Sequence, residues 1–446
     1  MPGTELAARI GGNPVAQGIL GAVLLLAGCS PTVPTCDDAA DASPPAVTPT
    51  WHADVRPLFE ITCARCHWDG GPGGFALDTY DDASTWAPAA ASAVAARTMP
   101  PFATASCCQE YDGELDLSPD QIAAVVAWAD AGAPEGDPAD YVAPEPVSTE
   151  LPRVDLSLTM DSAYVPDLPD GETDVSRCFL LDWPEEEPRY VTGLGVRPGN
   201  AAVVHHAIAL LAGPSVVDSF EALDAADPGA GWTCPGGVVW GATGWLGGWS
   251  PGWTGRAIPG GLGHRVEPGS KVILSVHYSV TSADPEPDQT TLDLMLADEV
   301  TGTLESLSVY DPTWLTGGMP IPAGRPDVVH SHATTPTPRS DGSSRRLVAV
   351  NLHMHERGSH GQVGIRHADG TTTCLLQIDR WDYDWQNDHV FADPLELAPT
   401  DELFVECHFD NTAGNQRVVN GVPEEPRDLN WAEDEEMCVA YVTAAQ

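Results

Sequence analysis

From about residue 150 onward, the chain consists of short apolar runs separated by Gly, Pro, Asp and Thr residues. No long stretch of this region repeats its apolar residues with the period of an α-helix. Such runs are typical of antiparallel strands joined by turns. The sequence therefore predicts antiparallel β-sheets here, arranged as sandwiches or barrels. The full length of 446 residues leaves room for two to four domains.

The clearest strand covers residues 347–355, where apolar and polar residues alternate. Successive side chains of a strand point to opposite faces. The expected core face carries Val348, Val350, Leu352 and Met354. The other face carries Ala349, Asn351, His353 and His355. Two imidazoles, two residues apart on a polar face, form a natural two-point site for a metal ion, so His353 and His355 are candidate ligands.

Two other runs bring histidines onto expected strands. In residues 272–280, alternate apolar residues form the core face and His277 points the other way, which makes it a candidate ligand. His205 and His206 are neighbours, and adjacent side chains diverge in a regular strand. They could share one metal only at a strand end, at a bulge or through different ring nitrogens, and the periodicity leaves this open.

The remaining candidates are weaker on pattern alone. Met437 shares a predicted strand face with Val439 and Tyr441, and a lone methionine is most often core filler. His330 and His332 form a second His-x-His pair, for which a solvated strand edge is the simpler interpretation. Five other histidines are expected to be ordinary polar or partly buried residues: His264, His360, His367, His389 and His408.

Cys63, Cys66 and His67 form a C-x-x-C-H motif, the attachment signature of c-type haem. The thiols would form thioethers and the histidine would bind the iron. The alternatives are a thioredoxin-like redox pair and a zinc half-site, for which the adjacent Cys107 and Cys108 make a poor second pair. Met99, in a Met-Pro-Pro segment, offers a second axial ligand, or it packs against the ring edge.

A helix is expected after this motif, because Ser118, Pro119 and Gln121 form an N-cap, an N1 proline and a capping box, and Gly132 ends the apolar stripe. Residues 51–145 as a whole resemble bacterial cytochrome c domains. The resemblance implies a small α-helical domain with one covalently bound haem c. Its axial ligands would be His67 and Met99.

The order His-His, His-Tyr, His-x-His and Glu-Met-Cys resembles the copper type II, ascorbate-dependent monooxygenases, which include peptidylglycine α-hydroxylating and dopamine β-monooxygenases. Residues 381–386 and 406–412 are similar to the bacterial members. The resemblance implies two antiparallel, jelly-roll-like β-sandwiches, over residues 150–300 and 301–446. Each would hold one of two copper ions.

The resemblance also implies roles for individual residues. His205, His206 and His277 match the electron-transfer copper site. His353, His355 and Met437 match the oxygen-activating site, where a thioether favours Cu(I). Tyr441 matches a tyrosine of the family and is a candidate catalytic residue. Cys407 and Cys438 match a disulfide beside the methionine ligand.

The implied reaction hydroxylates a C–H bond of a small organic substrate with O2. Electrons would come from ascorbate, another one-electron reductant or a donor protein, and would pass through the fused haem. Asn351 stands where peptide-amidating members carry an arginine, and Ser275 where they carry a glutamine, so a glycine-extended peptide is not the expected substrate. The alternative function is a non-enzymatic haem and copper electron carrier, or a copper-binding surface lipoprotein.

The N-terminus predicts export. Residues 19–28 form a short apolar segment that ends in Leu-Ala-Gly before Cys29, which resembles a bacterial lipobox. We expect a signal peptide over residues 1–29, lipidation of Cys29 and a flexible linker over residues 30–50, with a plain secretory signal as the alternative. The expected location is periplasmic, outer-membrane or cell-surface, with a lipid anchor in the membrane.

Cysteine usage and charge fit this location. Of 11 cysteines, three are assigned to lipid and haem, and the other eight allow 105 disulfide pairings, including a vicinal Cys107–Cys108 bond. Lys and Arg number 20 against 65 Asp and Glu, a net charge of −45, which argues against nucleic acid as a partner. The acidity either attracts a basic redox partner or serves solubility alone.

Overall fold

The computed structural model describes residues 45–101, 104–105, 108–113, 115–145, 150–168, 173–234, 241–253, 255–280, 285–383, 385–419, 422–432 and 435–446. The predicted signal peptide, Cys29 and residues 30–44 of the predicted linker lie outside these residues. Within the described part of the chain, no helix combines the length and the apolar character needed to cross a membrane.

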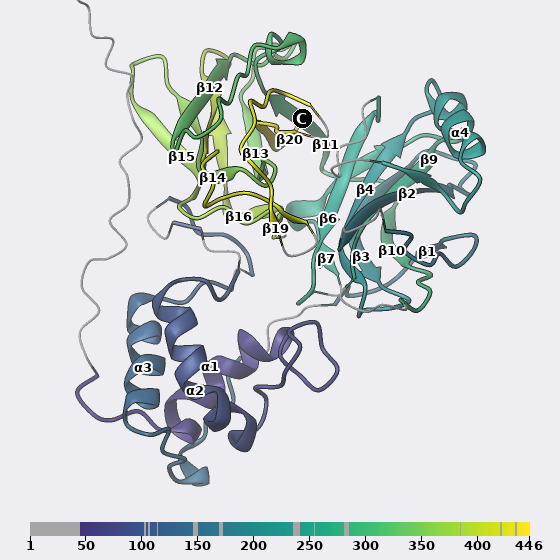
Figure 1. The fold of residues 1–446 in the computed structure, drawn as a ribbon. Coiled ribbons are helices and arrows are strands. Elements are labelled where there is room, and N and C mark those ends of the chain that lie inside the picture. The colour runs from purple at the N-terminus through teal and green to yellow at the C-terminus, as the bar shows by residue number, and fades with distance from the viewer. Residues whose placement is uncertain are drawn as a thin grey trace, which may run out of the picture. The chain divides into compact units, whose positions relative to one another are not determined.

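The N-terminal part is helical (Figure 1). Its helices are α1 (Arg56–Ile61), α2 (Tyr80–Ala95) and α3 (Pro119–Asp130). The predicted capping box of α3 is confirmed, because the Ser118 hydroxyl accepts from the backbone of Gln121 while the Gln121 side chain accepts from the backbone of Ser118. The core contains Trp51, Phe59 and Trp128, whose rings lie about 6 Å apart.

The described strands between residues 156 and 297 form a β-sandwich (Figure 1). One sheet has the order β5-β2-β9-β4-β6, and β1-β10-β3-β8, with β7 on β3, faces it across a shared core. The elements are β1 (Leu156–Thr159), β2 (Asp174–Asp182), β3 (Arg189–Arg197), β4 (Val204–Ala212), α4 (Val217–Ala226), β5 (Trp232–Thr233), β6 (Gly244–Trp249), β7 (Arg256–Ala257), β8 (Leu262–Val266), β9 (Lys271–Ser279) and β10 (Thr291–Ala297).

The described strands between residues 302 and 445 form a second sandwich around its own core. The order β12-β17-β14-β15 faces β11-β20-β13-β16, and β18 pairs with β19. The strands are β11 (Gly302–Val309), β12 (Val328–Thr334), β13 (Arg345–His353), β14 (Gly358–Arg366), β15 (Thr372–Ile378), β16 (His389–Leu397), β17 (Glu402–Phe409), β18 (Val418–Val419), β19 (Val422–Pro423) and β20 (Val439–Ala445).

A short parallel pairing between β8 and β11 joins sheets of the two sandwiches, at Gly302 with Leu262 and Thr303 with Gly263. The other described pairs of strands are antiparallel. This contact makes a single sheet of β1-β10-β3-β8-β11-β20-β13-β16. The expectation of purely antiparallel sheets therefore needs this one correction.

The expected core faces agree with the structure in β9 and only partly in β13. Val272, Val276 and their alternate neighbours lie in the first core, which confirms the prediction for β9. In β13 a bulge between Leu347 and Ala349 shifts the register. Because the bulge adds one residue, Leu347 joins the main core and Val348 packs in a separate small cluster, contrary to the strict alternation expected.

Disulfides join Cys178 to Cys234, Cys407 to Cys438 and Cys108 to Cys374. The last bond spans 266 residues and excludes a vicinal Cys107–Cys108 bond. It ties the segment between α2 and α3 to β15 of the second sandwich. A buried hydrogen bond from the Tyr111 hydroxyl to the carbonyl of Leu375 supports the same attachment.

Candidate metal centres

Three histidines converge in the first sandwich. His205 and His206 lie at the start of β4, and His277 lies on the adjacent strand β9. A bulge between Val204 and His206 shifts the register of β4 against β9, which is one of the arrangements that two neighbouring ligands require. Ring nitrogens of the three histidines lie within 4.8 Å of one another. This spacing suits a single metal ion.

Burial favours the neutral form of two of these imidazoles. It lowers the pKa of His205 to about 4, and it lowers the pKa of His206 well below its usual value. Neutral imidazole is the form that binds metals. The carboxylate of Asp174 lies 3.2 Å from Nε2 of His277, which leaves Nδ1 of His277 facing His206 at 3.3 Å. Although burial opposes it, hydrogen bonds from His277 and Thr173 lower the pKa of Asp174 to about 2.

A second pair of histidines lies at the end of β13. The rings of His353 and His355 are 5.0 Å apart, and burial lowers the pKa of His353 to about 4 and of His355 to about 3. Nδ1 of His353 is held by Gln386 at 2.6 Å, and Nδ1 of His355 by the carbonyl of Glu435 at 3.3 Å. Both Nε2 atoms are buried and have no hydrogen-bond partner among the described residues. A buried polar atom left without a partner is costly, and a metal ion would supply one.

The chain segment that contains Met437 lies beside these histidines. It is buried, and it lies just before β20, which pairs with β13 so that Val439 faces His353. The carboxylate of Glu436 accepts hydrogen bonds from the backbone N–H groups of His355 and Arg357. Burial raises the pKa of Glu436 to about 8. The Cys407–Cys438 disulfide anchors the same segment.

The loop between β15 and β16 lies between the two histidine groups. The ring of Tyr383 is 6.1 Å from His277 and 5.8 Å from His355. The ring of Trp385 is 5.0 Å from that of His205. Gln386 of the same loop also bonds to His353. The loop therefore contacts both histidine groups, and its residues can couple one group to the other.

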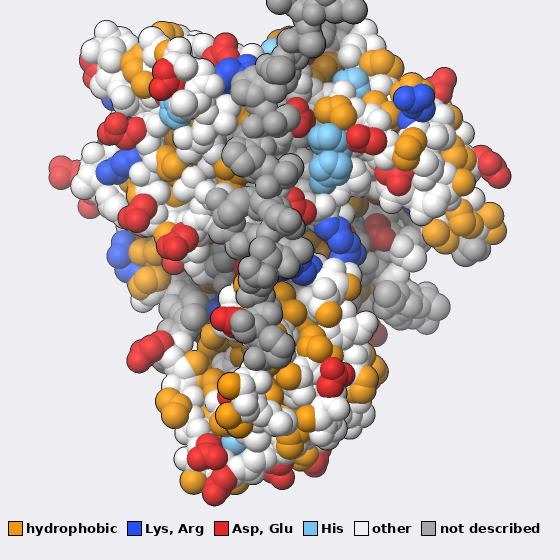
Figure 2. Space-filling view, turned by 90° about the vertical axis from the view of Figure 1, so that its left-hand side faces the viewer, with side chains coloured by type: hydrophobic (Ala, Val, Ile, Leu, Met, Phe, Trp, Pro, Cys, Tyr) orange, Lys and Arg blue, Asp and Glu red, His pale blue; other side chains and the backbone are white. Residues whose placement is uncertain are grey.

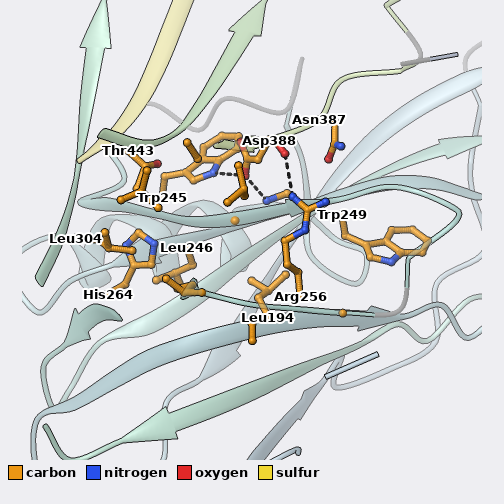
Figure 3. A pocket seen from close by; sticks show the side chains of 18 of the residues that line it. Leu194, Trp245, Leu246, Trp249, Arg256, His264, Leu304, Asn387, Asp388 and Thr443 are labelled. Carbon is orange, nitrogen blue, oxygen red and sulfur yellow. Dashed lines mark hydrogen bonds between the residues drawn. The ribbon is translucent and has the colours of Figure 1, made fainter. Parts of the chain in front are cut away.

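Asp388, at the end of the same loop, connects the two sandwiches (Figure 3). Its carboxylate accepts from Nε1 of Trp245 at 3.0 Å and from the backbone of Gly248 at 2.9 Å, both in β6. Trp245 in turn stacks on Tyr441 at 5.3 Å, and burial raises the pKa of Tyr441. A cavity of about 100 Å³ lies beside this contact, and His264 lines it.

Tyr441 also lines a small cavity of about 20 Å³, together with His206, His353 and Asn351. A larger cavity of about 340 Å³ is lined by Tyr383 and by several charged and polar residues. Its lining includes Asp174, Glu356, Arg357, Gln416 and Arg417. It has room for a small organic molecule.

The residues of the C-x-x-C-H motif lie in the helical part. Cys63, Cys66, His67 and Met99 line one mostly apolar cavity of about 570 Å³. Nδ1 of His67 is held by the carbonyl of Phe75 at 3.2 Å, which leaves Nε2 for a metal. Burial raises the pKa of Cys63 to about 12 and of Cys66 to about 11, and such thiols are poor nucleophiles. This disfavours a thioredoxin-like pair.

Several of the other histidines have ordinary partners. Nε2 of His330 lies 3.0 Å from the carbonyl of Pro320, His332 lies 3.6 Å from Asp311, and His360 stacks on His408. Sequence reasoning missed Asp174, Gln386 and Glu436. The signal for Glu436 was its place beside Met437, and Gln386 lay inside a segment already compared with the bacterial members.

Residues 315–444 match the family model for the C-terminal domain of copper type II ascorbate-dependent monooxygenases. This match supports that family. Among curated proteins, none matches the chain. Similar solved structures include the major capsid protein P2 of bacteriophage PM2, at 11% identity over 65% of this chain and 96% of that one, with a TM-score of 0.26. A two-domain protein of unknown function from Bacteroides fragilis NCTC 9343 has 10% identity over 65% and 94%, with a TM-score of 0.16. TM-scores this low do not indicate a shared fold.

The family match covers the part of the chain that contains His353, His355 and Met437. The copper monooxygenase family is one of oxidoreductases that depend on copper and ascorbate, which agrees with the chemistry of the second histidine pair. The first histidine group and the C-x-x-C-H motif lie outside the matched residues.

Proposed function

We propose that the protein is a copper monooxygenase that hydroxylates a C–H bond of a small organic substrate. Its electrons would arrive through a fused c-type haem from a one-electron donor protein or from ascorbate. The observation that carries the proposal is the pair of buried, unpartnered Nε2 atoms of His353 and His355, inside the region that matches the family. When bound, copper supplies one-electron chemistry and activates O2.

The chain's own residues would build each site. His205, His206 and His277 would hold one copper ion, and His353, His355 and Met437 the other. Gln386 and Glu435 fix the rings of the second pair through Nδ1, and Asp174 orients His277 through Nε2. Burial of both groups keeps bulk water away from the ligand nitrogens.

The cavity lined by Tyr383 gives a place for the substrate. Tyr383 lines it and also contacts His355, so a molecule in this cavity would lie close to the second pair of histidines. Charged and polar groups line the space, including Asp174 and Arg357, which favours a substrate with polar groups. Tyr441 differs from Tyr383 in that its ring is stacked against Trp245.

The haem proposal rests on the cavity in the helical part. It is mostly apolar, the thiols of Cys63 and Cys66 are free, and Nδ1 of His67 is held so that Nε2 can bind iron. Gly73 leaves space for the His67 ring, since a Cβ there would lie 2.4 Å from Nδ1. Met99 lines the same cavity and would be the second axial ligand.

Export and anchoring through Cys29 belong to the same proposal. The disulfides of the described residues suit an oxidising compartment. Acidic side chains are scattered over the face shown in Figure 2, among fewer Lys and Arg. Together with the net charge of −45, this favours a basic external electron donor.

The test is the metal content of the mature chain. The protein would be produced in a host with haem-maturation machinery and loaded with copper under reducing conditions. Elemental analysis and haem absorbance should then give two copper ions and one haem per chain. One haem without copper, or with zinc in its place, would contradict the monooxygenase and leave a cytochrome fused to a binding scaffold.

A further inference from the structure

Trp385 belongs to two sites at once. Its side chain lines the cavity that contains Cys63, Cys66 and His67 in the helical part. Its ring also lies 5.0 Å from the ring of His205, at an angle of 62°. The tryptophan comes from the loop between β15 and β16 of the second sandwich, so this loop reaches both the haem cavity and the first histidine group.

The helical part and the second sandwich are joined close to this tryptophan. Besides Trp385, Arg380 and Asp382 of the same loop line the cavity. The Cys108–Cys374 disulfide, the Tyr111 bridge to Phe391 and the hydrogen bond from Gln109 to the carbonyl of Cys374 hold the connecting segment against β15 and β16. The contact between Trp385 and the cavity is therefore part of a covalently fastened interface.

The first sandwich also reaches this cavity. A Cβ on Gly252 would lie 3.4 Å from Sγ of Cys66, and the guanidinium of Arg65 lies 4.8 Å from the ring of Trp253. All three parts of the chain therefore meet around the C-x-x-C-H motif. Of the cavity-lining residues, Trp385 has the aromatic contact with a copper-site histidine.

We propose that Trp385 is the residue that couples the haem cavity electronically to the copper site at His205, which rests on the proposed function above. One electron leaves a ferrous haem and reduces one cupric ion to cuprous, and no bond forms or breaks. Trp385 is a positioning residue in this step, because it fills the space between the two sites with a packed aromatic ring. Trp86, which also lines the cavity, stacks instead on Phe75 within the helical part.

The experiment follows the haem itself. The full chain, with haem attached and Cu(II) bound, is kept free of O2, its haem is photoreduced, and the return of the ferric absorbance is timed. Copper-free protein gives the background rate. Trp385→Leu should slow the copper-dependent reoxidation about tenfold or more. A tenfold change corresponds to ~1.4 kcal/mol of activation free energy. Trp385→Phe should keep most of the rate, because it keeps an aromatic ring.

Two controls separate coupling from damage. Trp68→Leu removes an exposed tryptophan that is next to His67 but does not line the cavity, and it should react at the wild-type rate. The haem and copper content per chain must be equal in all variants. A slower rate then reflects weaker coupling and not a missing cofactor. Should Trp385→Leu fail to fold, Trp385→Met would take its place with the same expected slowing, because it also removes the aromatic ring.

Equal rates for wild type and Trp385→Leu at full copper and haem content would overturn the inference. A wild-type haem that copper does not reoxidise would overturn it as well. The second outcome would also contradict the haem relay of the proposed function. Neither outcome bears on hydroxylation driven directly by ascorbate, so the assignment as a copper monooxygenase stands or falls on its own test. A loss of copper binding in the wild type would instead contradict the proposed function.

Discussion

Three of the candidate histidines present the ring nitrogen that their partners leave open. His353 and His355 are held through Nδ1, by Gln386 and by the carbonyl of Glu435, and present Nε2. His277 is held through Nε2 by Asp174 and presents Nδ1. Partners of this kind fix the tautomer and the orientation of a metal ligand. His277 is thus held in the opposite sense to His353 and His355.

Glu436 should be essential to the second centre although it binds no metal. Its two carboxylate oxygens accept from the backbone N–H groups of His355 and Arg357. Glu436→Gln keeps the shape but turns one acceptor into a donor, which leaves a buried N–H without a partner. We expect the free energy of unfolding to fall by about 1–3 kcal/mol. Chelator competition should show Cu(I) affinity lowered by about tenfold or more.

Glu425→Gln is the matched control, because Glu425 is exposed in the same part of the chain. It should change neither the free energy of unfolding nor the copper affinity. Wild-type affinity in Glu436→Gln would show that the backbone around His355 does not need this carboxylate, and the proposed role of Glu436 would be wrong.

Strand alternation could predict the faces of His277, His353 and His355, because period two is a local property of the chain. It could not supply Asp174 or Gln386. Asp174 is about a hundred residues from His277 along the chain and faces it only because β2 pairs with β9. Contacts of this kind depend on register between distant strands, which no spacing in the sequence encodes.

The strands and loops around the histidines also combine features that the sequence predicts with features that only the fold supplies. The neighbouring His205 and His206 could share a site only with an irregular strand, and the sequence left open whether one existed. The bulge at the start of β4 supplies it. The loop between β15 and β16 was singled out only by resemblance. Its contact with His355 lies within the second sandwich, whereas its contact with His205 depends on how the two sandwiches meet.

The disulfide beside Met437 gives a prediction for the segment that precedes β20. Replacing both Cys407 and Cys438 with Ser removes the bond that fixes Met437 next to β17. We expect the free energy of unfolding to fall by about 2–4 kcal/mol. Cu(I) affinity at the second centre should fall too, because the thioether loses its fixed position. Denaturant unfolding and chelator competition measure the two effects.

The matched control removes Cys178 and Cys234, which form a disulfide in the first sandwich. This variant should also be less stable, but its copper affinity at the second centre should equal that of the wild type. Should both double variants bind Cu(I) equally well, the disulfide at Met437 serves stability alone.

The assembly of the sandwiches was the part least accessible from sequence. The resemblance predicted two β-rich units, and the structure contains both. The parallel β8–β11 contact and the Cys108–Cys374 disulfide were not predicted. The eight unassigned cysteines allow 105 pairings, and a bond over 266 residues follows only from the three-dimensional packing.

Asp388 should hold the two sandwiches together. In Asp388→Ala, Nε1 of Trp245 and the backbone N–H of Gly248 lose their acceptor. A buried donor without a partner costs about 1–3 kcal/mol, so the melting temperature should fall and limited proteolysis between the sandwiches should accelerate. Asp393→Ala, at an exposed position of β16, is the control and should behave as the wild type. Unchanged proteolysis in Asp388→Ala would argue against this role.

The most direct test of the account is X-ray absorption at the copper edge of the Cu(I)-loaded, haem-containing protein. Haem attachment removes the thiols of Cys63 and Cys66 as competing sulfur ligands. Wild type should show histidine nitrogen scattering together with a copper–sulfur component from Met437. Met437→Leu conserves the volume of the side chain. Met319→Leu makes the same exchange at another buried methionine of the second sandwich.

The account predicts that the sulfur component disappears in Met437→Leu, persists in Met319→Leu, and that both variants still bind two copper ions. A wild-type spectrum without sulfur scattering, or a sulfur component that survives in Met437→Leu, would contradict the assignment of His353, His355 and Met437 as a copper site.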